Sequence, residues 1–148
     1  MTIPFSTASG GQREFAARVA MLAETGEFAR AFCAQRGIGH RDALRLMLII
    51  EELFTNTVRH GYRGDCDLPI RIALCAEETA VSLCYEDAAP PYDPLARFAS
   101  ASSALSAPFE ARHVGGLGIV LVGVLAEGAH YAYEGGWNRL WLKVRRAA

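Results

Sequence analysis

The stretch of sequence that decides the fold spans residues 49–62 and reads IIEELFTNTVRHGY. Its apolar residues recur at the three- and four-residue intervals of an amphipathic helix. These apolar residues are Ile49, Ile50, Leu53, Phe54 and Val58. We therefore expect the stretch to be the second half of a helix that begins near His40 and carries one apolar stripe.

Three polar residues of the same stretch, Glu52, Asn56 and His60, are spaced four residues apart. A helix turns by about 100° per residue, so each four-residue step drifts by only about 40° and the three side chains share one face. A carboxylate, an amide and an imidazole on one ridge can line a binding site. For an isolated E-x-x-x-N pattern the alternative is a solvated helix face, and the rest of the chain must decide between the two.

Composition and charge restrict the class of protein. The 148 residues suffice for one domain, and 51% hydrophobic with 21% charged residues indicates a globular chain. The longest apolar runs, 46–50 and 117–126, are far shorter than the roughly 20 residues that span a bilayer, so we expect no membrane segment. We also expect no secretory signal, and the net charge of −1 with dispersed arginines argues against nucleic-acid binding.

The cysteines and basic residues further restrict the class of protein. Four scattered cysteines without a C-x-x-C pair favour reduced, mostly buried thiols in a cytoplasmic protein, although a disulfide between Cys75 and Cys84 stays open. Lys143 is the single lysine. It lies outside the G-x-x-x-x-G-K frame of a P-loop and far from the early strand where a protein kinase carries its lysine, so both scaffolds are excluded. The kinase-like triplet 40–42 (HRD) lacks the required asparagine, and we interpret Asp42 as an acid near a helix N-terminus.

Periodicity predicts an α+β fold in which helices cover one face of a mixed, mostly antiparallel sheet, a two-layer arrangement. Residues 1–12 are expected to be a loose start and 13–146 a single domain. The predicted strands are 13–22, 70–76, 80–86, 129–134 and 138–144. The predicted helices are 24–35, the one from residue 40, and 115–127.

Two loops carry functional signals. Residues 88–114 contain four prolines and no convincing periodicity, and we interpret them as a mobile lid, with an inert insertion as the alternative. The segment that follows reads GGLG (115–118) and opens a helix. Its glycines permit close backbone approach to a ligand, and a helix N-terminus attracts phosphate, although tight packing also explains many such clusters.

Four segments together resemble the ATP-binding domain shared by gyrase, heat-shock chaperones, histidine kinases and mismatch-repair ATPases. They are EELFTNTVRHGY (51–62), EDAAPPYDP (86–94), GGLGIVLV (115–122) and GWNRL (136–140). Within that superfamily, which has the Bergerat-type fold, the chain most resembles the anti-sigma-factor serine kinases of bacteria. The resemblance covers about residues 13–146.

The resemblance implies a role for each matching residue. Asn56 would hold Mg²⁺ through its amide oxygen, and Glu52 would act as the base toward a substrate serine or a water. Asp87 would accept a hydrogen bond from the exocyclic amine of adenine. His60 would pack at the edge of the pocket.

The glycine segment and its neighbours would form the phosphate end of the same site. Gly115, Gly116 and Gly118, with Leu117 between them, would let the lid and the helix N-terminus wrap the phosphates. Arg112, followed by His113, would meet phosphate charge, and for both of them a plain surface role is the alternative.

One position departs from the family pattern. The family has Asp-x-Gly after this strand, whereas here Ala89 follows Asp87 and Ala88. If position 89 requires a positive φ, its β-carbon would weaken ATP binding.

The resemblance implies an ATP- and Mg²⁺-dependent serine/threonine kinase that binds a sigma factor, phosphorylates its antagonist protein and forms a homodimer. The alternative is a regulatory binding module that uses ATP as a conformational ligand or not at all. A detached catalytic domain of a two-component sensor is disfavoured, because no long helix with a phosphoacceptor histidine precedes the domain. Glu52 favours the kinase and Ala89 the binding module.

Overall fold

A computed structural model describes residues 10–99 and 117–147. The described strands form one sheet of order β1-β2-β3-β5-β4, in which every pairing is antiparallel. The strands are β1 (Gly10–Ala16), β2 (Pro69–Ala76), β3 (Ala80–Asp87), β4 (Gly128–Glu134) and β5 (Trp137–Arg145). The predicted α+β class is confirmed, and the parallel part that a mixed sheet requires does not occur among these strands.

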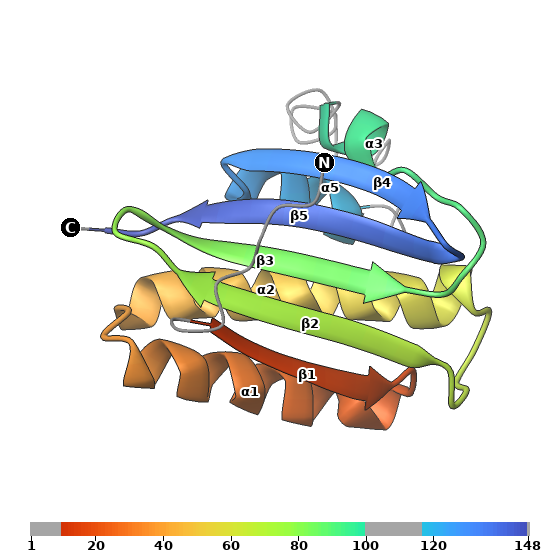
Figure 1. Cartoon of the computed structure of the whole chain (residues 1–148), viewed down its shortest axis with the longest axis horizontal. Coiled ribbons are helices and arrows are strands. Elements are labelled where there is room, and N and C mark those ends of the chain that lie inside the picture. Colours follow the sequence, from red (N-terminus) through yellow and green to blue (C-terminus); the bar gives the residue numbers. More distant parts are fainter. Residues whose placement is uncertain (1–9, 100–116, 148) are drawn as a thin grey trace.

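Helices cover one face of the sheet, with α1, α2 and α5 side by side behind the strands in Figure 1. The central helix α2 contacts both α1 and α5. The helical segments are η1 (Val19–Met21), α1 (Leu22–Gln35), α2 (His40–Asn56), η2 (Thr57–Gly61), α3 (Leu95–Ala99) and α5 (Leu117–Leu125). No helix within the described ranges is long and apolar enough to cross a bilayer.

Helix α2 forms where the apolar spacing predicts it. Leu46, Ile49, Ile50 and Phe54 are fully buried against the sheet, and each contributes about 1.5–3 kcal/mol through burial. The helix begins at His40, after an extended Gly39. Asp42 lies in the first turn, as expected, and its Oδ2 accepts the Ala147 N–H at 2.8 Å. The N-terminal end of α2 is thereby joined to the last residues of the chain.

The C-terminal end of α2 widens into one π-helical turn, η2, in which the Tyr62 N–H donates to the Thr57 carbonyl at 2.8 Å. Such turns are frequent at functional sites. The turn buries Thr57 and Val58 while His60 remains exposed. The polar ridge of α2 therefore ends at a helix terminus that borders the open end of the sheet.

The predicted alternation of the central strands is confirmed. Every second residue faces the helices and is buried, as the register of β2, β3 and β5 requires. The inward residues are Ile70, Ile72, Leu74, Val81, Leu83, Tyr85, Leu140, Leu142 and Val144. The four cysteines are free, so Cys75 and Cys84 form no disulfide.

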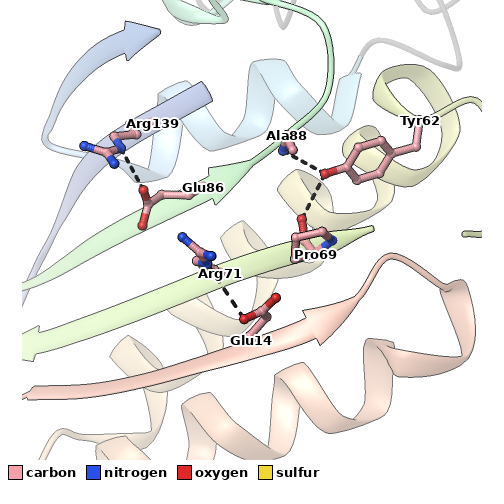
Figure 2. A network of polar contacts seen from close by, with 7 residues as sticks. All are labelled: Glu14, Tyr62, Pro69, Arg71, Glu86, Ala88 and Arg139. Atoms are coloured by element: carbon pink, nitrogen blue, oxygen red, sulfur yellow. Dashed lines mark hydrogen bonds and ion pairs between the residues drawn. The ribbon is translucent and has the colours of Figure 1, made fainter. Parts of the chain in front are cut away.

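The face of the sheet opposite the helices carries a ladder of charges. Glu14, Arg71, Glu86 and Arg139 are successive cross-strand neighbours on β1, β2, β3 and β5. Glu14 pairs with Arg71 at 3.8 Å and Glu86 with Arg139 at 2.8 Å (Figure 2). Partly exposed ion pairs contribute about 0–1 kcal/mol each, so this ladder favours the correct register more than it stabilises the fold.

Two boundaries differ from the predictions. The first strand begins at Gly10, inside the segment expected to be loose, and ends at Ala16, not at residue 22. The chain turns after Ala17, and Val19, which is 41% exposed, gives its N–H to Asp65 at 2.9 Å. Within the expected lid, residues 95–99 form α3, which packs on α5. The remainder of that lid, from residue 100, lies outside the described residues.

Removal of one buried side chain tests the α2 stripe. We predict that Ile50→Ala lowers the free energy of unfolding by about 2–5 kcal/mol, because it leaves a cavity between α2 and the sheet. Glu51→Ala, at the exposed neighbouring position, serves as the control and changes the free energy of unfolding by less than about 0.5 kcal/mol. Urea unfolding followed by circular dichroism measures both, and equal effects would contradict the burial of this stripe.

Candidate functional site

A cavity of about 430 Å³ opens where the C-terminal end of α2 meets the ends of β3 and β5. Its size falls within the range of small-molecule sites. Helix α3 and helix α5 also reach it, through Arg97 and Ile119. Polar side chains in the lining of the cavity include those of Asn56, Thr57, His60, Asp87 and Asn138.

Asp87, the last residue of β3, is the only carboxylate among the described residues that line this cavity. It is 8% exposed. Its Oδ2 accepts the Thr57 hydroxyl at 2.8 Å, and its Oδ1 accepts the Asn138 amide at 2.9 Å and the Ala89 N–H at 3.1 Å. A carboxylate has about four acceptor positions, and the described residues occupy three of them, so Oδ2 retains one for a ligand N–H.

The hydroxyl groups of Thr57 and Tyr85 form a hydrogen-bonded chain that ends at Asp87. The Tyr85 hydroxyl lies 2.7 Å from the Thr57 hydroxyl and 3.1 Å from the Leu53 carbonyl. Full burial raises the pKa of Tyr85 well above its usual value, so the phenol keeps its proton. Because Thr57 gives its single proton to the carboxylate, the one Tyr85 proton is shared between the Thr57 oxygen and the Leu53 carbonyl. The Thr57 hydroxyl bond fixes which way Asp87 faces.

Asn138, at the start of β5, joins the loop after β3 to the sheet. Besides its bond to Asp87, the Asn138 amide nitrogen contacts the Ala89 carbonyl at 3.0 Å. The amide oxygen accepts the Tyr92 N–H at 3.0 Å and the Tyr131 hydroxyl. The Asn138 side chain therefore joins Asp87 to the loop residues Ala89 and Tyr92.

Tyr62 joins the helical side of the cavity to the sheet. Its hydroxyl donates to the Pro69 carbonyl at 2.9 Å and accepts the Ala88 N–H at 2.7 Å, as Figure 2 shows. Burial raises the pKa of Tyr62 to about 12, so the phenol stays protonated at physiological pH. The residue that follows Asp87 is thus fixed to the end of η2 and to β2.

The structure accommodates Ala89 without backbone strain. Arg63 is the one non-glycine residue with positive φ in the described part of the chain, so Ala89 has an ordinary conformation. Ala89 is 3% exposed and packs against Gly61, where an added Cβ would lie 3.0 Å from its own. The sequence suggests that the β-carbon of Ala89 weakens ATP binding. In the structure this β-carbon has room because Gly61, which it faces, has no side chain.

The three ridge residues do not all reach the cavity. Asn56 and His60 line it, as predicted, whereas Glu52 does not. The Glu52 carboxylate instead lies against the first turn of α5, beside Gly118. Burial is the main cause that raises the pKa of Glu52; the charge of Glu51 adds to the rise and that of Arg59 opposes it.

Other predicted residues of the phosphate end are only partly visible. Arg112, His113, Gly115 and Gly116 lie outside the described residues, and Leu117 is the first residue of α5. Thr57, Tyr85, Tyr131 and Asn138 were not predicted as site residues. The pairing of Asp87 with Asn138 across β3 and β5 would have indicated the last of these, but a single sequence does not give that pairing.

An antiparallel sheet with helices on one face, and a cavity of small-molecule size between its central helix and the strand ends, defines an α+β domain with a candidate ligand site. The chain belongs to the family described as histidine kinase-like ATPase domain, whose sequence profile matches residues 15–144. A comparison with curated proteins finds no match.

Two solved structures share the fold. The RsbU and RsbW domains of Rv1364c from Mycobacterium tuberculosis match with a TM-score of 0.63 and 17% identity, over 93% of this chain. The match spans 33% of that chain, so the present sequence corresponds to about a third of its length. The SiaB–SiaC complex from Pseudomonas aeruginosa matches with a TM-score of 0.56 and 13% identity, over 91% of this chain and 89% of that one.

The role of Asn138 as the joint of the cavity can be tested by substitution. We predict that Asn138→Ala lowers the free energy of unfolding by about 1–3 kcal/mol and speeds amide hydrogen exchange at Tyr92, because buried partners lose their hydrogen bonds. Tyr131→Phe removes the hydroxyl that donates to Asn138 and accepts the Tyr92 N–H at 3.2 Å, but it leaves the Asn138 bonds to Asp87 and Ala89 intact, so it should have the smaller effect on the free energy of unfolding. Unchanged exchange at Tyr92 in Asn138→Ala would contradict the assigned contacts.

Proposed function

We propose that the chain is an ATP-binding regulatory protein that transfers the γ-phosphoryl group of Mg·ATP to a serine of a partner protein. The family supports the nucleotide, and the resemblance to anti-sigma-factor serine kinases supports the acceptor. The observation that carries the proposal is the buried Asp87 carboxylate, which keeps one acceptor position toward a cavity of about 430 Å³.

Asp87 would select the base. The exocyclic amine of adenine donates a hydrogen bond, whereas guanine presents a carbonyl oxygen at the equivalent position. The free acceptor position on Oδ2 therefore suits adenine and repels guanine. The hydroxyl chain through Thr57 and Tyr85 keeps the carboxylate in this orientation.

Asn56 would hold the metal. Its amide oxygen is a hard ligand of the kind that Mg²⁺ takes alongside waters and phosphate oxygens, and it lines the cavity one turn after Glu52. Bound Mg²⁺ would neutralise phosphate charge. Glu52 would accept the proton of the attacking hydroxyl, and its raised pKa makes it a stronger base than an exposed glutamate.

A binding module without phosphoryl transfer is the second candidate. The position of Glu52 outside the cavity wall, against α5, favours it. The structural likeness to a chain of the SiaB–SiaC complex supports a protein partner under either candidate. A sigma factor or its antagonist is the partner that the sequence resemblance indicates, and a homodimer remains part of the proposal.

Calorimetric titration tests the nucleotide site. We predict that ATP binds with a Mg²⁺-dependent affinity, and that GTP binds at least about tenfold more weakly because its carbonyl meets Asp87. Asn56→Ala should bind ATP equally with and without Mg²⁺. No binding at millimolar ATP, or equal affinities for ATP and GTP, would overturn the assignment of the site.

The role of Glu52 separates the two candidates. Glu52→Gln should bind Mg·ATP within a few-fold of the wild type but, with water as the acceptor in place of the serine, release far less phosphate from it, because the amide cannot accept the proton. Since burial raises the pKa of Glu52, the wild-type rate should rise with pH in a range above that of an exposed glutamate. Phosphate release that is the same in both proteins would leave the binding module as the function.

A further inference from the structure

Helices α2 and α5 approach each other at the position of Glu52. Gly118 lies in the first turn of α5, and the next residues toward the core, Ile119 and Val122, are buried. A Cβ added at Gly118 would lie 2.8 Å from Glu52 Cδ, 3.6 Å from Cγ and closer still to Oε2. All three of its nearest atoms belong to that one side chain.

The nearest atoms to an added Cβ distinguish Gly118 from Gly123, the other glycine of α5. An added Cβ at Gly123 would lie 2.7 Å from the Cα of Phe98, so that glycine permits the backbone of α3 to pack on α5. At Gly118 the neighbour is the free end of a flexible side chain. A larger residue would thus move the carboxylate and leave the helices in place.

The position of the Glu52 carboxylate determines how strong a base it is. Helix α5 reads LGIVLVGVL and has no charged side chain. Within residues 10–99 and 117–147, the charges that act on Glu52 are therefore those of Glu51 on α2 and Arg59 on η2. The contact with α5 removes part of the carboxylate from water. Desolvation favours the protonated form and makes the deprotonated form a stronger base.

We propose that Gly118 is a positioning residue, whose missing side chain allows the Glu52 carboxylate to lie against α5 and so fixes the place from which it acts. The proposal rests on the proposed function of Glu52 as the base. It gives Gly118 a role through Glu52, in addition to the phosphate contact that the resemblance implies for the glycine segment.

The first test needs no nucleotide. Thermal unfolding is compared for the wild type, Glu52→Ala, Gly118→Ala and the double variant. Gly118→Ala should lower the Tm only when Glu52 is present, because Glu52→Ala removes all three atoms that the new methyl group meets. Gly128→Ala, at an open position without positive φ, is the matched control and should leave the Tm unchanged. An equal loss in both backgrounds would overturn the proposal.

The second test follows the carboxylate itself. In ¹³C NMR titrations without nucleotide, the pKa of Glu52 should be lower in Gly118→Ala than in the wild type, because the displaced carboxylate returns to water. Gly128→Ala should leave it unchanged. A Glu52 pKa that stays the same in Gly118→Ala would contradict the inferred contact.

The third test concerns the reaction. Phosphate release from Mg·ATP should fall roughly 10- to 100-fold in Gly118→Ala, with Mg·ATP affinity within a few-fold of the wild type and the rise of the rate shifted to lower pH. In the Glu52→Ala background, Gly118→Ala should change neither rate nor affinity. Weaker Mg·ATP binding in that background would show that Gly118 contacts the nucleotide directly. If the wild type binds no ATP, the proposed function fails, while the first two tests still decide where Gly118 holds Glu52.

Discussion

The burial of the apolar stripe of α2 against the sheet is the constraint on which the other features depend. Ile49, Ile50 and Phe54 are fully buried, so the rotation of the helix about its axis is fixed. A rotation by one residue, about 100°, would bury polar groups without partners. The same packing therefore directs Glu52 toward α5 and Asn56 toward the cavity. The arrangement of the site follows from the core.

A second constraint acts at the end of β3. The register of β3 and β5 places Asp87 opposite Asn138, and their hydrogen bond links the two strands to the loop that follows Asp87. Tyr62 holds the same loop from the helical side. Segments far apart in the sequence thus share one polar network, which presents a carboxylate with an available acceptor position. Such preorganisation favours ligand binding, because little order has to be gained when the ligand arrives.

The sequence predicts the features whose causes are local. The stripe of α2, the alternation of β2 and β3 and the closing hairpin each follow from burial patterns within one segment. The predicted first strand extends to residue 22, but the chain turns after Ala17, where residues far along the sequence hold it: Ala17 bonds to Cys66 and Leu68, and Asp65 accepts the Val19 N–H. Such contacts leave no signal in the local sequence, so the predicted end of the first strand is wrong.

Non-local packing also explains what the sequence missed in the site. The fit of Ala89 depends on Gly61, and the position of Glu52 depends on Gly118. In each case a glycine on one element matches a side chain on another. Composition and spacing show both glycines but not what they face. The order of the motifs indicated the family, whereas the contacts between the motifs required the structure.

The most direct measurement is a crystal structure with Mg²⁺ and a non-hydrolysable ATP analogue. The account predicts the adenine amine within hydrogen-bond distance of Asp87 Oδ2 and the metal ion on the Asn56 amide oxygen. A nucleotide bound elsewhere, or one whose base makes no contact with Asp87, would contradict the account.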